Sequence, residues 1–311
     1  MTAPQRPRIA RRALDGVLLL DKPIGLSSND ALIRAKRLYL AKKAGHTGTL
    51  DPLASGLLPL CFGEATKFSQ DLLEADKTYE ATMRLGVRTT TGDAEGEAAE
   101  TRDVSCDEAA VIDAMARFRG DIVQIPPMYS ALKRDGKPLY EYARAGQVVE
   151  REGRQVTIYV LDLIACALPD VTFRVTCSKG TYVRTLAEDI GEALGCGAHL
   201  VALRRTGVGA LTLEHAVTLD ALSDATESAR DAWLQPVDAL LSTFPEVQLD
   251  AEAARRFLHG QRLRLDELAI SQDVLKQSPR MRVYGEGRLL GVAKAGDGVL
   301  APERLVVSAA N

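Results

Sequence analysis

The sequence predicts an α+β fold, in which residues 1–245 form a mixed, largely antiparallel sheet flanked by helices and residues 246–311 form a small β module. Lys77–Leu85 and Val171–Cys177 alternate apolar and polar side chains, which is typical of half-buried strands. After Pro245 the chain changes to short apolar runs separated by glycines, which indicate further short strands. These observations divide the chain into two parts of unequal size.

The first elements are placed by local signals. We expect Met1–Ala13 to form a flexible basic arm, because chain termini are poorly ordered unless they are tied down. Gly16–Asp21 contains a short apolar run that fits a buried strand. Ser27 or Ser28 is a suitable N-cap for a helix that the pattern extends to about Lys43.

The later elements alternate between regular and irregular segments. Residues 89–96 are polar and rich in turn formers, and residues 107–118 carry apolar side chains at helical spacing. Residues 125–154 contain many prolines and glycines, and so long an irregular insertion is often functional. Residues 181–194 again have helical spacing, and residues 217–244 form a mostly helical, acidic connector.

The composition is that of an ordinary soluble protein. The chain has 311 residues, of which 46% are hydrophobic and 26% charged, which is enough for two packed domains. It contains no run of about 18 apolar residues and no apolar signal-peptide core, so we expect a cytoplasmic protein without a membrane span. Five scattered cysteines and four histidines lack the spacing of disulfide frameworks or metal sites, so we expect neither.

The net charge of −3 does not match the basic character that is usual among nucleic-acid binders. The distribution is more informative, because the first 43 residues hold ten Lys or Arg against three acidic residues, a local balance of 10 − 3 = +7. A basic segment of this kind can follow a phosphate backbone, and it can equally be a solvated helix face and tail. Charge alone leaves both interpretations open.

The run Gly45–Pro59 is the most informative stretch of the chain. It places one carboxylate, Asp51, among small and turn-forming residues, with the imidazole of His46 five positions upstream. Small residues let a large substrate approach the backbone, and a carboxylate held in such a loop can act as nucleophile or base. Asp51 followed by Pro52 also fits the start of a short helix, with Asp as the N-cap. The residues alone leave both roles open.

Seven blocks of the sequence share a likeness to one family in a fixed order. They are Gly16–Lys67, Lys77–Tyr79, Gly92–Gly96, Pro126–Lys133, Leu139–Arg144, Cys177–Thr185 and Leu203–Arg205. With these blocks the chain resembles the bacterial TruB-type tRNA pseudouridine synthases, strongly over residues 16–205 and weakly beyond. Several long blocks in the right order are far more specific than a short motif.

The resemblance implies an isomerase that converts one uridine of the tRNA T loop, U55, to pseudouridine. The reaction detaches uracil from ribose and rejoins it through C5, so it consumes no phosphate and oxidises nothing. No cofactor is expected, and the sequence has no Walker A or Rossmann fingerprint in a suitable context. The implied partner is the T arm of tRNA, without DNA, a membrane or a required protein partner. Residues 125–154 correspond to a mobile thumb, and residues 246–311 to a PUA-like RNA-binding domain.

The resemblance assigns roles to five residues of the implied active site. Asp51 is the essential carboxylate, which attacks ribose C1′ or removes a ribose proton. Arg184 is the cation that keeps this carboxylate ionised. Tyr79 packs against the target base and assists proton loss from C5, while Tyr182 and Leu203 contact the substrate. From pattern alone, Tyr79 and Leu203 fit core positions, and Arg184 fits a surface helix charge.

Two further positions concern base flipping and a departure from the family pattern. His46 corresponds to the residue that enters the RNA loop and replaces the stacking lost when the uridine is turned out. Thr90 stands where the family often carries Asp, whereas Asp93 keeps the second acidic position. A role shared by two carboxylates in that loop is therefore open.

Two other functions compete with this interpretation. One is a pseudouridine synthase of the dyskerin class that depends on a guide RNA. The long insertion at residues 125–154 argues against it. The other is an RNA-folding factor that binds tRNA without catalysis, a role that can coexist with the enzyme.

Overall fold

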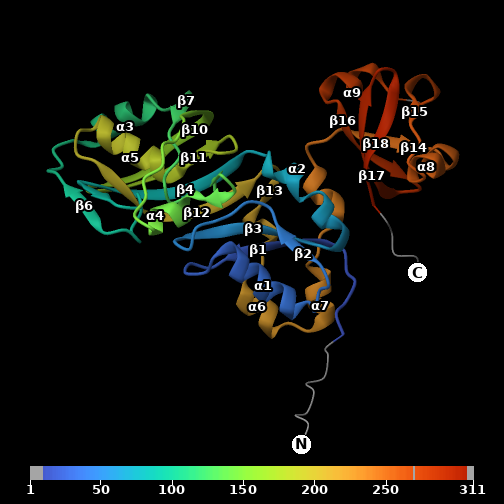
Figure 1. Cartoon of the computed structure of the whole chain (residues 1–311), viewed down its shortest axis with the longest axis horizontal. Coiled ribbons are helices and arrows are strands. Elements are labelled where there is room, and N and C mark those ends of the chain that lie inside the picture. The colour runs from blue at the N-terminus through green and yellow to red at the C-terminus, as the bar shows by residue number, and fades with distance from the viewer. Residues whose placement is uncertain (1–9, 269, 307–311) are drawn as a thin grey trace, which may run out of the picture.

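The computed structural model describes residues 10–268 and 270–306, and its first part is built on one large twisted sheet (Figure 1). The strand order is β1-β3-β12-β4-β11-β10-β7, with β2 beside β3 and β13 beside β12. The strands are β1 (Gly16–Lys22), β2 (Ala44–His46), β3 (Ala54–Phe62), β4 (Lys77–Leu85), β7 (Gly120–Gln124), β10 (Arg154–Ala167), β11 (Asp170–Cys177), β12 (Ala198–Val208) and β13 (Leu211–Thr212). Among the described strands of this sheet, only β3 and β12 pair in parallel, which confirms the predicted mixed, largely antiparallel sheet.

Helices and 3₁₀ turns flank this sheet and bury its apolar side chains. They are α1 (Ser28–Leu38), η1 (Gly63–Lys67), α2 (Ser69–Leu73), α3 (Glu108–Ala116), α5 (Val183–Ala193), η2 (Leu213–His215), α6 (Leu219–Asp224), α7 (Glu227–Ala232) and η3 (Val237–Leu241), whereas α4 (Leu139–Arg144) lies in the insertion described below. Figure 1 shows α3 and α5 beside one half of the sheet, and α1, α6 and α7 beside the other half. Each half has its own core of buried aliphatic and aromatic side chains, and Tyr79 and Leu203 pack against both cores.

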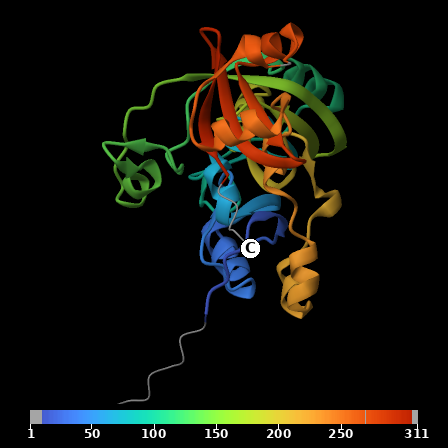
Figure 2. The same cartoon turned by 90° about the vertical axis from the view of Figure 1, so that its right-hand side faces the viewer.

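Two small hairpins project from the sheet. They are formed by β5 (Val87–Thr89) with β6 (Ala98–Thr101), and by β8 (Lys133–Arg134) with β9 (Lys137–Pro138). The second hairpin and α4 belong to the predicted irregular insertion. In Figure 2 this green segment stands away from the body of the sheet. Few of its side chains are buried. This exposure agrees with its many prolines and glycines, which are typical of surface loops.

The C-terminal part is a curled five-stranded sheet with the order β14-β16-β17-β18-β15. Its elements are β14 (Glu246–Leu249), α8 (Ala251–Leu258), β15 (Leu263–Arg264), η4 (Leu265–Glu267), α9 (Gln272–Gln277), β16 (Arg280–Gly285), β17 (Arg288–Gly296) and β18 (Val299–Leu305). The short apolar runs do form strands, but the module is not all-β. Asp250 caps α8, whose Phe257 is fully buried in the core of the module.

Three local predictions need correction. The helix that Ser27 caps ends at Leu38 rather than near Lys43, because Leu40 has a positive φ of 51° that breaks the helical path. Residues 51–53 form a turn and not a helix, since the apolar run that follows is drawn into the sheet as β3. Of the predicted N-terminal arm, residues 1–9 lie outside the described part, while Arg12 is tied down by an ion pair to Asp231.

The two parts of the chain meet around a buried carboxylate. Asp71 of α2 has a side chain that is only 3% exposed, and it lies between two arginines of the C-terminal sheet. Arg280 Nη1 is 2.8 Å from one carboxylate oxygen, and Arg304 Nη1 is 3.2 Å from the other. Val292 of β17 adds an apolar contact, because it joins the core cluster that contains Phe68.

Replacing Asp71 by asparagine is therefore expected to destabilise the protein. The variant leaves both arginines without their shared anion, and we expect the free energy of unfolding to fall by about 2 kcal/mol, between the values for exposed and buried ion pairs. Chemical denaturation measures this change. Glu303→Gln is the matched control, because it removes a more exposed partner of the same Arg280 and should have a smaller effect. Equal effects of the two substitutions would contradict the docking role of Asp71.

Candidate active site

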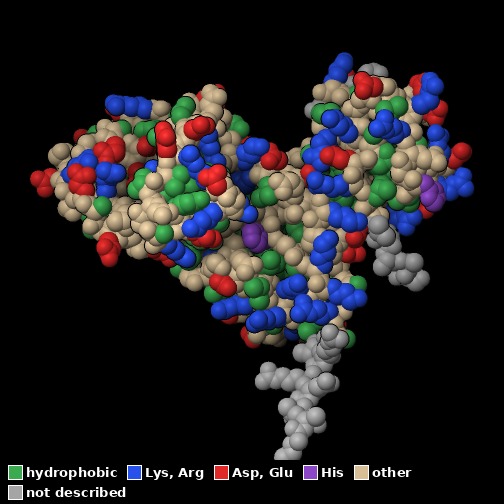
Figure 3. All heavy atoms as spheres, viewed as in Figure 1, with side chains coloured by type: hydrophobic (Ala, Val, Ile, Leu, Met, Phe, Trp, Pro, Cys, Tyr) green, Lys and Arg blue, Asp and Glu red, His purple; other side chains and the backbone are tan. Residues whose placement is uncertain are grey.

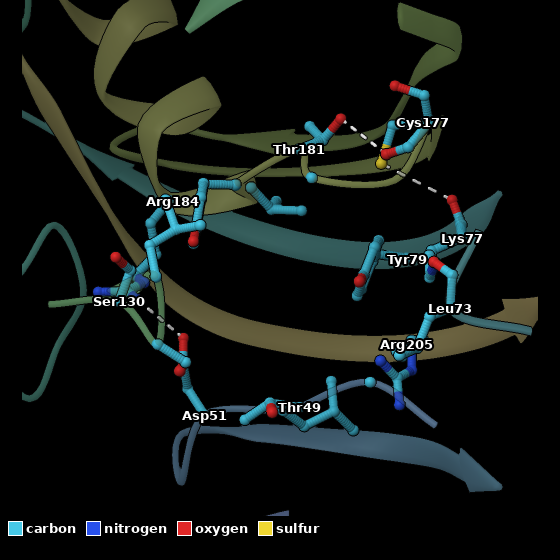
Figure 4. A pocket seen from close by; sticks show the side chains of 18 of the residues that line it. Thr49, Asp51, Leu73, Lys77, Tyr79, Ser130, Cys177, Thr181, Arg184 and Arg205 are labelled. Carbon is cyan, nitrogen blue, oxygen red and sulfur yellow. Dashed lines mark hydrogen bonds and ion pairs between the residues drawn. The ribbon is translucent and has the colours of Figure 1, made fainter. Parts of the chain in front are cut away.

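A cleft of about 1070 Å³ opens on the large sheet where β3, β4 and β12 lie beside the start of α5. Five of the six residues with assigned roles line it: Asp51, Tyr79, Tyr182, Arg184 and Leu203. Figure 4 shows Asp51 and Thr49 on one side, Arg184 and Ser130 next to Asp51, and Tyr79 on a central strand. Residues that are far apart in the sequence therefore share one site.

The carboxylate of Asp51 is held by a well-ordered turn that comes directly before β3. The amide of Ala54 donates to the Asp51 carbonyl at 3.0 Å, and the Leu50 amide donates to the buried Ser28 Oγ at 2.7 Å. Gly56 is needed close by, because its φ is +99° and a Cβ there would lie 2.2 Å from the Arg205 carbonyl. These contacts point the Asp51 side chain into the cleft rather than into a helix cap.

Arg184 is the electrostatic centre of the site. It is only 5% exposed, and its Nη2 lies 3.0 Å from a carboxylate oxygen of Asp51. Its Nη1 lies 3.5 Å from a carboxylate oxygen of Asp93. The same two nitrogens donate to the carbonyls of Thr91 and Tyr129 at 2.9 and 2.7 Å. One guanidinium thus joins the catalytic loop, the β5–β6 loop and the insertion.

Asp51 is an anion in a poorly solvated place. Its side chain remains 41% exposed, but that surface faces the narrow cleft. Desolvation raises the pKa of Asp51, Arg184 opposes the rise, and Asp93 adds to it. The carboxylate therefore exchanges its proton at a higher pH than an ordinary aspartate. A raised pKa makes the ionised carboxylate a stronger base and nucleophile.

Thr90 and Asp93 do not share one role. Asp93 is 3% exposed and pairs with Arg184, whereas the Thr90 hydroxyl accepts a hydrogen bond from the Glu97 amide. Thr90 therefore closes the loop, and a single carboxylate of this loop contacts the arginine. The sequence left open which of the two positions mattered, and the structure assigns the contact to Asp93.

Tyr79 and Tyr182 present aromatic faces beside the carboxylate. Tyr79 lies on β4, and burial raises the pKa of its hydroxyl, with the neighbouring Arg205 opposing the rise. Tyr182 is the residue before α5, and the guanidinium of Arg154 lies 4.8 Å from the centre of its ring. Leu203 of β12 completes an apolar wall on which a planar base can pack.

His46 is the one assigned residue that does not line the cleft. It ends β2 and pairs with Leu60 of β3, two residues before Gly48 at the cleft wall. Its Nδ1 is buried without a hydrogen-bond partner. Burial lowers the pKa of His46, and Arg205 adds to the lowering, so the imidazole is neutral at pH 7. A neutral ring is suited to stacking rather than to ion pairing.

Several cleft residues were not singled out from the sequence. Gln70, Leu73 and Arg154 lie outside the blocks that carry the family likeness. The others include the insertion residues Ser130–Lys133, the strand residues Lys77 and Cys177, and Arg205. These others lie within the blocks, so the signal was present, but no spacing rule points to their chemistry. Within residues 10–268 and 270–306, no group of three or more His, Cys, Asp or Glu side chains is arranged to hold a metal ion. No helix in that part is long and apolar enough to cross a membrane.

Figure 3 shows the hollow of the molecule bordered by Lys and Arg side chains, with more of them over α1 below it. The basic residues on and after α1 are Arg34, Lys36, Arg37, Lys42 and Lys43. They form the positive segment that the charge count indicated, on the surface next to the cleft. This arrangement suits a polyanionic substrate despite the net negative charge of the chain.

Comparison with known families agrees with this geometry. Residues 36–183 match the family described as "TruB family pseudouridylate synthase (N terminal domain)". Residues 184–242 match "tRNA pseudouridylate synthase B C-terminal domain", and residues 245–306 match "Pseudouridine synthase II TruB, C-terminal". The chain belongs to the TruB family of pseudouridine synthases. It is an enzyme of the isomerase class, as the resemblance predicted.

Relatives resemble the chain over nearly its whole length. A protein named tRNA pseudouridine synthase B from Burkholderia mallei is 81% identical over 310 residues, covering 99% of both chains. The protein of the same name from Cupriavidus metallidurans is 66% identical and covers 98% of both. Among solved structures, a chain of a Cbf5–Nop10–Gar1 complex has a TM-score of 0.71 at 28% identity. It covers 93% of this chain and 84% of that one, so the fold extends beyond close relatives.

Proposed function

We propose that this TruB-family enzyme isomerises U55 in the T loop of tRNA to pseudouridine, with Asp51 as the essential carboxylate. The observation that carries the proposal is the Asp51–Arg184 ion pair of 3.0 Å in a cleft walled by Tyr79 and Leu203. The names of relatives that are 66 and 81% identical support tRNA as the substrate. The basic surface beside the cleft suits its phosphate backbone.

The geometry supports a reaction in which the base is first turned out of the RNA. A uridine inside a folded loop cannot reach a carboxylate on the cleft floor, so it must be extruded. Tyr79 and Leu203 then hold the uracil while Asp51 acts at the ribose, either by attack on C1′ or by removing a ribose proton. Both routes need the ionised carboxylate that Arg184 stabilises.

We further propose that the chain has two domains, one for catalysis and one for RNA binding. Residues 1–245 form the catalytic domain, whose thumb-like insertion at residues 125–154 closes over the RNA. Residues 246–311 form a PUA-like RNA-binding domain. The insertion already touches the site, because Arg184 Nη2 donates to the Tyr129 carbonyl. This reach of the insertion into the site supports an enzyme that contacts its RNA without a guide RNA, and we expect that it requires no protein partner.

Release of tritium from C5 of uridine tests the proposal. The purified protein is incubated with an unmodified tRNA transcript labelled at C5, and with a transcript in which U55 alone is replaced by cytidine. Release from the first and none from the second is the expected result. Release from both would place the target elsewhere in the RNA. Tight binding without release would favour a folding factor or a guide-dependent enzyme.

His46→Ala is expected to weaken tRNA binding more than it slows the chemical step. The neutral imidazole supplies stacking to the opened loop, and loss of one stacking contact corresponds to a Kd about tenfold larger. Filter binding gives the Kd, and single-turnover kinetics at saturating enzyme give the rate. His215→Ala is the control, because this histidine is exposed in η2 of the catalytic domain and does not line the cleft. An unchanged Kd for His46→Ala would contradict the proposed role.

A further inference from the structure

Three buried cations besides Arg184 belong to this region: Lys77 and Arg205 line the cleft, and the charge of Lys22 interacts with that of Asp51. Their hydrogen-bonding groups are not equally paired. Lys22 and Lys77 each donate to two backbone carbonyls through Nζ. Arg205 donates through Nε to the Leu57 carbonyl at 2.7 Å, but its Nη2 is buried and has no hydrogen-bond partner. Among the described residues no carboxylate pairs with Arg205, and the Tyr79 hydroxyl is the polar neighbour that favours its charge, whereas Arg184 has two carboxylates.

The fold places this guanidinium at the floor of the cleft. Arg205 lies on β12 directly opposite Tyr79 of β4 and Gly56 of β3, so the three strands fix its backbone. Its Nη1 approaches Gly48 so closely that an added Cβ there would lie 3.5 Å away. Figure 4 shows the guanidinium between Thr49 and Tyr79, with Asp51 further along the same loop. Arg205 lines the cleft although it is only 1% exposed.

A buried guanidinium without an anion is costly. Burial without full pairing disfavours the charged form, and each unsatisfied donor adds to the cost. The positive charge of Arg205 also acts on a neighbouring lysine. Burial lowers the pKa of Lys77 to about 8, and the charge of Arg205 contributes to that lowering. Such preorganised positive charge is useful where a negative charge develops during a reaction.

We propose that Nη2 of Arg205 donates a hydrogen bond to a carbonyl oxygen of the target uracil and stabilises the anion that uracil becomes during the reaction. The proposal rests on the proposed function of this same cleft. When the C1′–N1 bond breaks, its electron pair leaves with N1, and the negative charge spreads to O2 and O4. Either C1′ then forms an ester with Asp51, or Asp51 removes the ribose proton at C2′ and the electron pair of that C–H bond forms a C1′–C2′ double bond.

The charge disappears as the isomerisation is completed. The electron pair at C5 forms the new bond to C1′, which releases Asp51 or returns the ribose proton. The C5 proton then leaves and N1 gains a proton, so no atom is lost overall. Arg205 stays protonated throughout and acts only on the uracil anion. The apolar wall of Tyr79 and Leu203 lowers the local dielectric, which strengthens this interaction.

Uracil fits this donor better than a backbone phosphate does. Arg205 is 1% exposed beneath Tyr79, so only a group that enters the cleft can reach it. A flat base with an exposed carbonyl oxygen satisfies this condition once it is flipped out. The phosphates remain outside, where the basic residues near α1 are exposed. A phosphate contact would act on binding, whereas a contact to the uracil anion acts on the rate.

The test compares tRNA carrying uridine or 5-fluorouridine at the target position. Fluorine withdraws electrons and makes the uracil anion intrinsically more stable, so the enzyme's contribution should matter less. Consumption of the target nucleoside is followed under single-turnover conditions by chromatography of digested tRNA, and Kd by filter binding. The variants are Arg205→Gln and Arg205→Lys. Arg204→Gln is the control, because the neighbouring Arg204 pairs with Asp21 instead.

We expect Arg205→Gln to slow the reaction of uridine by about 100-fold, as loss of an oxyanion donor does, and that of 5-fluorouridine by less than about tenfold. Kd should change by less than about threefold, and Arg204→Gln should keep the wild-type rates. Equal slowing on both substrates would overturn the proposal. So would a weaker Kd with an unchanged rate at saturation, which would indicate a phosphate contact.

Folding is controlled separately. Circular dichroism melting establishes that each variant is folded, and if Arg205→Gln fails to fold, Arg205→Lys decides. The proposal is supported if Arg205→Lys slows the reaction of uridine tRNA more than that of 5-fluorouridine tRNA. It is refuted if Arg205→Lys slows both reactions equally. Wild-type enzyme that is inactive on tRNA would refute the proposed function. An active wild type matched by both variants would refute only the role of Arg205.

Discussion

Replacing Asp51 by asparagine is expected to lower the single-turnover rate by about 10⁴-fold or more, the range seen when a group central to covalent or acid–base catalysis is lost. Asparagine keeps the shape of the side chain but can neither attack C1′ nor accept a ribose proton. The Asp51 carboxylate pairs with Arg184, which keeps its contacts to Asp93 and to the Thr91 and Tyr129 carbonyls in the variant, so we expect the fold to persist. Tritium release from C5-labelled tRNA measures the rate.

Binding of tRNA should survive this substitution. The Asp51→Asn variant removes one negative charge from a cleft that receives a polyanion, so Kd should stay equal or tighten slightly. Asp113→Asn is the control, since Asp113 is exposed on α3. Wild-type turnover by Asp51→Asn would refute the proposed mechanism. If the variant lost both tRNA binding and turnover, Asp51 would have a structural role instead.

The pH dependence of the wild-type rate tests the same carboxylate. The pKa of Asp51 is raised, mainly by desolvation, and only the ionised form is active. The rate should therefore be full above this pKa and decline as the pH falls through it, at a higher pH than for an ordinary aspartate of pKa about 3.9. Single-turnover rates measured from acidic to neutral pH give the acid limb of the pH–rate profile. An acid limb at or below the ordinary value would contradict the desolvated site.

Replacing Arg184 by glutamine is expected to have the second-largest effect. It leaves the carboxylates of Asp51 and Asp93 without their shared cation, and the carbonyls of Thr91 and Tyr129 lose their donors. Because breaking a buried ion pair from one side costs about 3–5 kcal/mol, we expect a loss of stability of that order. The rate should fall by about 100-fold or more, since Asp51 is less well held and less often ionised.

Two measurements separate stability from catalysis in Arg184→Gln. Chemical denaturation gives the free energy of unfolding. The pH–rate profile of the folded variant should show its acid limb shifted to higher pH, because the pKa of Asp51 rises when the opposing cation is removed. Arg84→Gln is the control, since it breaks an exposed ion pair with Asp170 far from the cleft lining. A lower rate with an unshifted acid limb would mean that Arg184 does not control the ionisation of Asp51.

Local sequence patterns predicted the strands and helices whose apolar side chains recur with the period of a strand or of a helix. β4 and β11 follow the period of two, and Asp107 caps α3 where the helical spacing begins. The same patterns failed after Asp51, where a good capping residue begins no helix. There, the pairing of β3 with β1 and β12 outweighed the local preference. Neither β10 nor β12 was anticipated, because their burial depends on neighbours in the sheet.

The sequence by itself determined the family, the α+β class and the identity of Asp51 as the candidate carboxylate, because each is written in contiguous residues. Only the tertiary structure decided the environment of that carboxylate. It joined Arg184 to Asp93 rather than Thr90, and it enclosed Arg205 without an anion. The reason is that the solvation and pairing of a charge depend on segments distant in the chain, which no local pattern records.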